Sequence, residues 1–171
     1  VVGGGSAGVA AAVAAARAGA DTMLVERSGA LGGLATGGLV ALLLTLDDGR
    51  GRQVIAGLCQ EIVDRLTARR AAFHPPRAEW GAQDAASVAR DRRWGLVWGA
   101  PPHHVRYSVA YDPEDMRLVL AEICRESGVR MLLHSLACEA LRDGDRLRGV
   151  TFQGKSGRFA ILADVVIDAT G

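Results

Sequence analysis

The spacing of apolar residues at the start of the chain predicts a strand, a turn, a helix and a second strand. Two valines stand directly before a glycine-rich turn at residues 3–8. The alanine-rich stretch 9–18 has a high helix propensity, and Gly19 is suited to end that helix. Residues 22–25 form a short apolar run that is typical of a buried strand and ends at Glu26. This order of elements is that of a βαβ unit.

Apolar residues at helical spacing predict two further helices. Between Ile55 and Leu66 the apolar side chains recur every three or four residues, which is the pattern of an amphipathic helix that ends near Arg70. Asp112 is followed by a proline and two acidic residues, a sequence that favours the start of a helix, and Gly128 is suited to end it.

The last third of the chain predicts strands. Residues 129–136 form an apolar run, and residues 147–162 alternate around a Gly-Lys-Ser-Gly turn in the manner of a β-hairpin. A final apolar run covers residues 165–169. We expect the hairpin to lie beside one parallel sheet, whose members are residues 1–2, 22–25, 129–136 and 165–169.

Residues 72–110 interrupt this rhythm. They hold four of the five prolines, all three tryptophans and three of the four histidines. We interpret the segment as an irregular insertion, which could be the start of a substrate or lid subdomain.

The first strand has only two residues and the chain stops at the turn after the final strand, so we expect residues 1–171 to be a partial domain, truncated at both ends.

Side chains that can transfer protons occur in this segment, but none is assigned a catalytic role. A histidine there could pass a proton during a redox reaction. No base is paired with an orienting carboxylate in the sequence, however, so packing or solvation is the favoured interpretation. Packing is also expected for the tryptophans. The residues considered are His74, His103, His104, Tyr107, Tyr111, Trp80, Trp94 and Trp98.

The composition is typical of a globular protein. Of the 171 residues, 49% are hydrophobic and 23% are charged, and the net charge is +1, so no basic field favours binding to nucleic acid. No apolar stretch approaches the ~20 residues that a membrane span needs. The three cysteines match no metal-ligand spacing, so we expect no metal site and a cytoplasmic location. The charge run at 90–93 is expected to be a solvated face.

Gly3, Gly5 and Gly8 have the GxGxxG spacing of dinucleotide-binding folds. The first glycine permits a tight turn, the second lets the backbone approach a pyrophosphate, and the third allows the helix to pack closely on the sheet. The free N–H groups at the start of the helix then face the phosphates. Glu26 lies 18 residues after Gly8, near the ~20 expected for a carboxylate that binds the adenosine ribose. Because this carboxylate would repel a 2′-phosphate, the sequence disfavours NADP.

The segment from Gly3 to Gly33, GGGSAGVAAAVAAARAGADTMLVERSGALGG, resembles the start of the glutathione-reductase-type FAD-binding fold. Three later segments resemble the FAD-dependent oxidoreductase family of this fold in the same order, namely SGVRMLLHS (127–135), GVTFQGKSGR (149–158) and ADVVIDATG (163–171). The resemblance implies an α/β, Rossmann-like FAD/NAD(P)-binding domain with a parallel sheet and an antiparallel β-meander crossover.

The resemblance also implies FAD as the cofactor and a role for each matching residue. The first glycine turn would hold the pyrophosphate, Glu26 would bind the adenosine ribose, and Arg27 and the backbone of Ala137 would adjoin the adenine. The second glycine pair and the residues after it would lie along the pyrophosphate and the flavin, and the final Ala-Thr-Gly would form a turn close to the cofactor. The implied cofactor-binding residues are Gly3, Gly5, Ser6, Ala7, Gly8, Glu26, Arg27, Gly32, Gly33, Ala35, Thr36, Ala137, Thr170 and Gly171. No cysteine pair follows Gly33, unlike in the disulfide reductases of this fold.

The favoured function is a flavin-dependent oxidoreductase that passes reducing equivalents between a small organic substrate and FAD. Three alternatives are open: an NAD-dependent dehydrogenase, which the hairpin argues against, a non-catalytic dinucleotide-binding module, and a flavin-linked hydroxylase or isomerase. The isolated chain is expected to be inactive. No nucleic-acid partner is expected, and no substrate, catalytic residue or oligomeric state is assigned.

Overall fold

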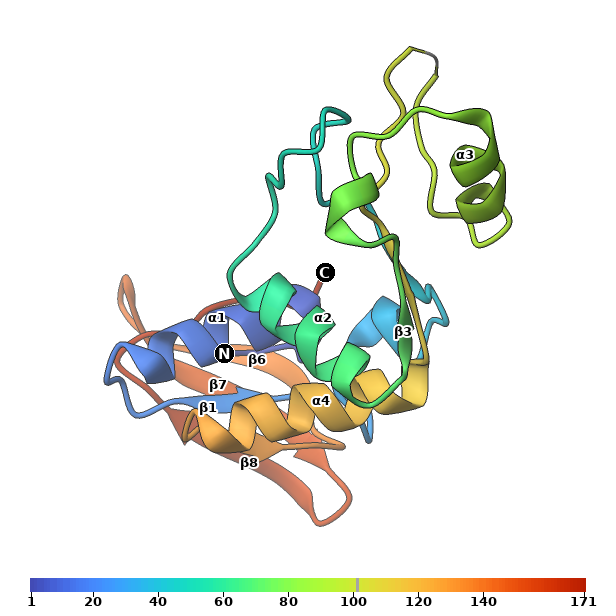
Figure 1. The fold of residues 1–171 in the computed structure, drawn as a ribbon. Helices are drawn as coiled ribbons and strands as arrows, with labels where there is room; N and C mark the ends of the chain where they lie inside the picture. The colour runs from blue at the N-terminus through green and yellow to red at the C-terminus, as the bar shows by residue number, and fades with distance from the viewer. Residues whose placement is uncertain (101) are drawn as a thin grey trace. The chain divides into compact units, whose positions relative to one another are not determined.

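The computed structural model describes residues 1–100 and 102–171, so Pro101, one of the prolines of segment 72–110, lies outside the described residues. The chain divides into two compact units, and Figure 1 labels most of their helices and strands. The first unit comprises Val1–Gly38 and Leu120–Gly171, and the second comprises Leu39–Val119. The second unit thus contains the whole of segment 72–110 and extends beyond it on both sides.

A parallel sheet forms the centre of the first unit. Strand β1 (Met23–Val25) pairs in parallel with β5 (Arg130–Leu132). On the other side of β1, Val2 forms parallel bridges both to Val25 and to Asp168. The predicted parallel alignment of the four segments, with residues 1–2 beside residues 165–169, is therefore confirmed.

The prediction of one strand over residues 129–136 is wrong in its length, because the observed strand is shorter. Strand β5 ends at Leu132, and Leu136 already belongs to the next strand. Between them, His134 adopts a left-handed backbone conformation with a φ of 53° and turns the chain out of the parallel sheet. Residues other than glycine rarely adopt this conformation, so the spacing of apolar residues could not indicate the turn.

An antiparallel meander follows in the first unit, made of β6 (Leu136–Asp143), β7 (Arg146–Gly154) and β8 (Gly157–Leu162). The predicted hairpin is confirmed, because β7 and β8 pair in antiparallel fashion up to the Gly154–Gly157 turn. Phe152 of β7 is buried together with Val2 and Val25. The meander and the parallel sheet therefore share one hydrophobic core.

Helix α1 (Ser6–Arg17) ends as the sequence predicts. Gly19 has a φ of 92°, which a side chain would disfavour. The N–H of Gly19 donates to the oxygen of Ala16 at 2.9 Å, and the N–H of Ala20 donates to the oxygen of Ala15 at 3.1 Å. This pair of bonds is the Schellman arrangement that satisfies the last carbonyl groups of a helix.

The other predicted helices are also present, one of them shortened. Helix α4 (Pro113–Glu126) begins after Asp112, whose carboxylate accepts a hydrogen bond of 2.7 Å from the N–H of Glu114. This is the N-terminal cap that the sequence predicts. Helix α2 (Leu58–Ala68) begins later than predicted, and Ile55 lies before it with 46% of its surface exposed.

The second unit is built around a small antiparallel sheet with the strand order β2 (Leu42–Leu43), β4 (Val109–Tyr111) and β3 (Ala72–Phe73). Its core includes Leu46, Val63, Trp80 and Tyr107, and the rings of the last two are stacked with 3.8 Å between their centroids. Segment 72–110 contributes β3, the 3₁₀ turn η2 (Arg77–Glu79), helix α3 (Ala85–Arg92) and part of β4, so it is more regular than predicted.

The charge run at 90–93 is only partly a solvated face, which corrects the prediction. Asp91 is fully buried, and its carboxylate accepts a hydrogen bond of 2.5 Å from the guanidinium of Arg106, which is also fully buried. Arg90 bonds to the same carboxylate at 2.7 Å.

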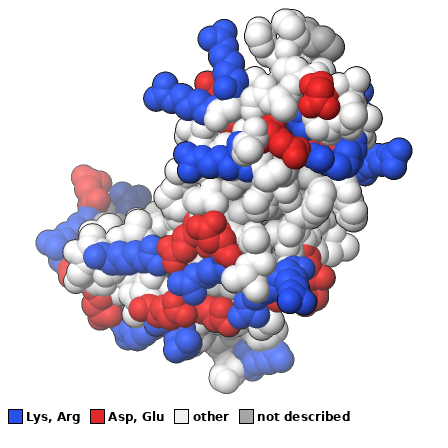
Figure 2. Space-filling view, viewed as in Figure 1, with Lys and Arg blue, Asp and Glu red and all other residues white. Residues whose placement is uncertain are grey.

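Elsewhere, exposed acidic and basic side chains lie next to one another on the face of the molecule that Figure 2 shows.

Candidate functional site

Gly3 and Gly8 are glycines because of how the chain itself packs. Gly3 has a φ of 96°, and a Cβ there would overlap the carbonyl group of Ala169. A Cβ on Gly8 would overlap the carbonyl oxygen of Gly3 and lie 3.4 Å from the side chain of Ala169. The start of α1 therefore packs directly against the first glycine turn and the last parallel segment.

Gly5 differs from these two glycines, because no atom lies within 4 Å of the position that its Cβ would take. Its φ of −66° is available to any residue. It is the N-cap of α1, and no side chain of the described residues caps this helix. Ser6 and Ala7 are exposed, so the first turn of the helix, whose N–H groups have no acceptor within the helix, lies at the surface. Such a helix N-terminus favours the binding of an anion.

Glu26, at the end of β1, is tied to the glycine turn. It is buried, and its two carboxylate oxygens accept hydrogen bonds from the backbone N–H groups of Gly4 at 2.6 Å and of Ser28 at 2.7 Å. Burial raises the pKa of Glu26, but these hydrogen bonds outweigh it and hold the pKa below the ordinary value. The Ser28 side chain also hydrogen-bonds to this carboxylate, and the side chain of Glu26 therefore stays ionised at neutral pH.

The second glycine loop lies beside the first. The N–H of Gly32 donates to the oxygen of Gly4 at 2.7 Å, and a Cβ on Gly33 would lie 3.2 Å from the Cα of Gly5. Ala35 follows in a 3₁₀ turn, η1 (Gly33–Ala35). Thr36 is buried, and its hydroxyl donates to the oxygen of Leu31 at 2.6 Å. In this structure the Thr36 side chain closes the loop rather than facing outward.

The remaining predicted positions lie on three segments. Thr170 is exposed and directly follows Ala169, against which Gly3 packs, and its N–H and hydroxyl both donate to the carboxylate of Asp168, at 3.0 and 2.9 Å. Gly171 has a φ of 86°. Ala137 lies in β6, half-buried and opposite Phe152, and Arg27 is exposed in the loop after Glu26.

Two contacts beside these residues have no signal in the sequence. The ring of His134 lies over Gly29, and the N–H of His134 donates to the oxygen of Ser28 at 3.0 Å. The N–H of Ser135 donates to the oxygen of Glu26 at 2.9 Å. Both contacts arise from the parallel pairing of two segments more than a hundred residues apart, which local patterns do not report.

The histidine and tyrosine candidates of the second unit are packing residues for the most part. Tyr107 is fully buried and donates to the side-chain oxygen of Gln60 at 2.7 Å, and Tyr111 donates to the oxygen of Val40 at 2.7 Å. His104 is buried beside Gln83. The favoured interpretation of these residues as packing groups is supported by these contacts. Trp94 and Trp98 are about half exposed, in contrast to the buried Trp80.

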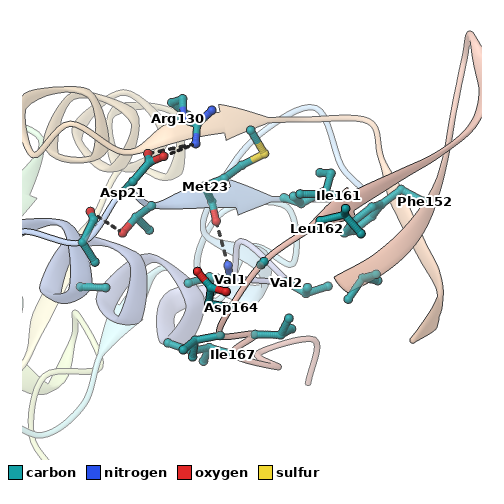
Figure 3. Close-up of a pocket in the computed structure, with 18 residues that line it drawn as sticks. Val1, Val2, Asp21, Met23, Arg130, Phe152, Ile161, Leu162, Asp164 and Ile167 are labelled. Atoms are coloured by element: carbon teal, nitrogen blue, oxygen red, sulfur yellow. Dashed lines mark hydrogen bonds and ion pairs between the residues drawn. The ribbon is translucent and has the colours of Figure 1, made fainter. Parts of the chain in front are cut away.

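A cavity of about 670 Å³ opens at the amino ends of the parallel strands (Figure 3). One terminal nitrogen of the Arg130 guanidinium donates to both carboxylate oxygens of Asp21, each at 2.9 Å, and the amino group of Val1 donates to the oxygen of Met23 at 2.8 Å. Ligands of open α/β sheets bind at the carboxyl ends of the strands. The glycine turns and Glu26 lie at those carboxyl ends, so this cavity is not part of the candidate site.

Neither a metal-binding cluster nor a membrane-spanning helix is present in the described part of the chain. Within residues 1–100 and 102–171, no three histidine, cysteine, aspartate or glutamate side chains are grouped to hold a metal ion. The same residues include no helix whose length and apolar character would let it cross a membrane. The three cysteines are free thiols, with Cys124 buried, Cys59 half-buried and Cys138 exposed.

The chain matches a known protein family. The sequence profile of the family described as FAD dependent oxidoreductase matches residues 1–171. No curated protein matches the chain.

Several solved structures share the fold. Thermovibrio ammonificans THI4 is 18% identical with a TM-score of 0.57, over 99% of this chain and 55% of that one. The p-nitrophenol 4-monooxygenase PnpA of Pseudomonas putida DLL-E4 is 18% identical with a TM-score of 0.57, over 93% and 37% of the two chains. The 3-ketosteroid-delta4-(5alpha)-dehydrogenase of Rhodococcus jostii RHA1 is 17% identical with a TM-score of 0.54, over 95% and 43%. The chain thus spans about half, or less, of the length of these proteins, and the likeness is one of fold.

Proposed function

Because the chain belongs to the FAD dependent oxidoreductase family, we propose that it supplies the dinucleotide-binding part of an enzyme that passes reducing equivalents between a small organic substrate and FAD. The observation that carries the proposal is the open position at Gly5. Two of the three fingerprint glycines are required by the packing of the chain, whereas Gly5 leaves room that the described residues do not fill. A pyrophosphate that approaches the backbone would explain why this position has no side chain.

The hydrogen bonds between the two glycine turns support a single binding surface. Gly4 bonds both to Gly32 and to Glu26, so the N-terminus of α1, the ribose-binding carboxylate and the second turn are held in one arrangement. In the proposed arrangement Gly3, Gly5, Ser6, Ala7 and Gly8 cradle the pyrophosphate. Seven other residues extend this surface toward the adenine or toward the flavin: Arg27, Gly32, Gly33, Ala35, Ala137, Thr170 and Gly171. Thr36, predicted as an eighth, is buried and supports the second glycine loop from behind.

FAD, when bound, supplies the redox chemistry, because the flavin ring accepts and donates a hydride or single electrons. The residues of this chain bind and orient the cofactor. The ionised carboxylate of Glu26 accepts hydrogen bonds from the ribose hydroxyls and repels a 2′-phosphate. The N–H groups of the first turn of α1 stabilise the negative charge of the pyrophosphate.

The absorption spectrum of the purified full-length protein tests the cofactor. We expect the two visible bands of an oxidised flavin, and we expect heat or acid to release FAD rather than FMN or a nicotinamide dinucleotide. Anaerobic addition of an electron donor should then bleach the bands. A bound flavin that no donor reduces would indicate a non-catalytic module, and a bound NAD without flavin would indicate a dehydrogenase of another class.

A further inference from the structure

The proposed arrangement of FAD defines where its adenine ring lies. The pyrophosphate is at the N-terminus of α1 and the ribose is at Glu26. Because the base is joined to the ribose on the side away from the phosphates, it falls beyond Glu26. The residues that follow Glu26, and the segment hydrogen-bonded to them at 134–135, therefore border the adenine. This inference rests on the proposed function.

His134 lies at this border in a conformation that a side chain disfavours. Its φ is 53°, where glycine has no steric penalty and other residues are uncommon. Its N–H is fixed by the oxygen of Ser28 at 3.0 Å, and the N–H of the next residue is fixed by the oxygen of Glu26 at 2.9 Å. A side chain at a strained position points to a role for that side chain.

The imidazole of His134 rests on Gly29. A Cβ at residue 29 would come within 2.7 Å of the Cε1 atom and 2.8 Å of the Nε2 atom of this ring, but 3.7 Å from Nδ1. The ring therefore contacts the loop through its Cε1–Nε2 edge, and any side chain larger than that of glycine at residue 29 would displace it. His134 is otherwise exposed, so the rest of its aromatic surface is accessible.

We propose that His134 is a cofactor-binding residue whose imidazole stacks on the adenine ring of FAD. Aromatic side chains stack on nucleobases through their faces, without a requirement for particular hydrogen bonds. Histidine is also the aromatic residue that best tolerates a left-handed backbone, which accounts for its presence at this turn. The backbone hydrogen bond to Ser28 fixes the turn, and the contact with Gly29 holds the ring beside the residue that binds the ribose.

Two variants of the full-length protein test this role, His134→Asn and His134→Gly. Asparagine tolerates the left-handed conformation and glycine relieves its strain, so both variants should fold with an unchanged melting temperature or a higher one. The dissociation constants of FAD and FMN are measured for each apoprotein by quenching of flavin fluorescence. We expect FAD to bind about tenfold more weakly, the scale of one base–aromatic stack, and FMN, which has no adenine, to bind as in the wild type. His103→Asn, which replaces an exposed histidine of the second unit, is the matched control and should change neither constant.

Unchanged FAD affinity in both variants overturns the proposal. An equal loss for FAD and FMN also overturns it, because the effect would not depend on the adenine. If Gly5→Val abolishes FAD binding while the His134 variants bind normally, only the role of His134 is wrong and the proposed function stands. If the wild-type protein binds no FAD, both fail.

Discussion

The carboxylate of Glu26 accepts a hydrogen bond of 2.6 Å from the backbone N–H of Gly4, so one side chain joins the end of β1 to the glycine turn. Its other oxygen accepts from the N–H of Ser28 at 2.7 Å. Glu26 therefore has a part in the fold that is independent of any nucleotide. In the proposed function the same carboxylate also binds the adenosine ribose, and substitutions should separate the two roles.

Replacement of Glu26 by alanine should weaken FAD binding by about 1.5–3 kcal/mol, the scale of a hydrogen bond to a charged group. Glu26→Gln keeps the size of the side chain and one acceptor oxygen, so it should lose less affinity. Equilibrium titration of the apoprotein with FAD measures both. If neither variant changes the affinity, Glu26 serves only the turn.

Glu26 should also make stability depend on pH. Because its pKa is lower in the folded protein than its ordinary value of 4.5, the ionised form stabilises the fold above the pKa of the unfolded chain. This contribution is lost as the pH falls through the folded pKa. The free energy of unfolding of the wild type should therefore exceed that of Glu26→Gln near neutral pH, and the difference should shrink below about pH 4. Urea denaturation over this range is the measurement, and a difference that is independent of pH would contradict the expectation.

Gly5→Val should fold and yet purify without flavin. The position of its Cβ is open in the protein, so the valine has room, but it would occupy the space that the proposed site gives to the pyrophosphate. Gly8→Val is the contrasting variant, because its side chain would meet the carbonyl oxygen of Gly3. It should lower the free energy of unfolding by at least the ~1–3 kcal/mol typical of overpacking. The ratio of flavin to protein absorbance and a thermal melt distinguish the two outcomes, and normal flavin content in folded Gly5→Val would refute the proposed site.

The buried pair of Asp91 and Arg106 predicts a stability effect in the second unit. Asp91→Ala would leave the Arg106 guanidinium buried with fewer acceptors, and loss of one partner of such a pair costs about 3–5 kcal/mol. The double variant Asp91→Leu with Arg106→Met should recover much of that loss, because it leaves no uncompensated charge. Denaturation of the single and double variants gives the comparison. A single variant as stable as the wild type would show that water reaches the site.

The parts of the fold that the sequence predicts well are those set by neighbouring residues. The glycine spacing at 3–8, the helix stop at Gly19 and the cap at Asp112 each depend on a few consecutive residues. The hairpin at 147–162 is equally local, since its alternation and its glycine turn lie within one short stretch. These signals were sufficient to predict the βαβ start and its carboxylate.

The parts that it does not predict depend on partners distant in the sequence. Asp91 reads as part of a charged surface run, and only Arg106 explains its burial. The turn at His134 depends on a left-handed residue that no apolar spacing marks, and it shortens the predicted strand. The two-residue strands β2 and β3 are too short to produce an alternating pattern, so the small sheet of the second unit has no signature in the sequence.

Val2 forms parallel bridges to Val25 on one side and to Asp168 on the other. Its N–H donates to the oxygen of Ile167 at 2.9 Å, and its oxygen accepts from the N–H of Ala169 at 2.8 Å. This closure joins segments separated by nearly the whole chain, so it carries the largest loss of chain entropy in the first unit. Such non-local pairings are slow to form. The turn that packs Gly3 against Ala169 is consequently expected among the last features to be completed during folding, well after the local helices and the β7–β8 hairpin.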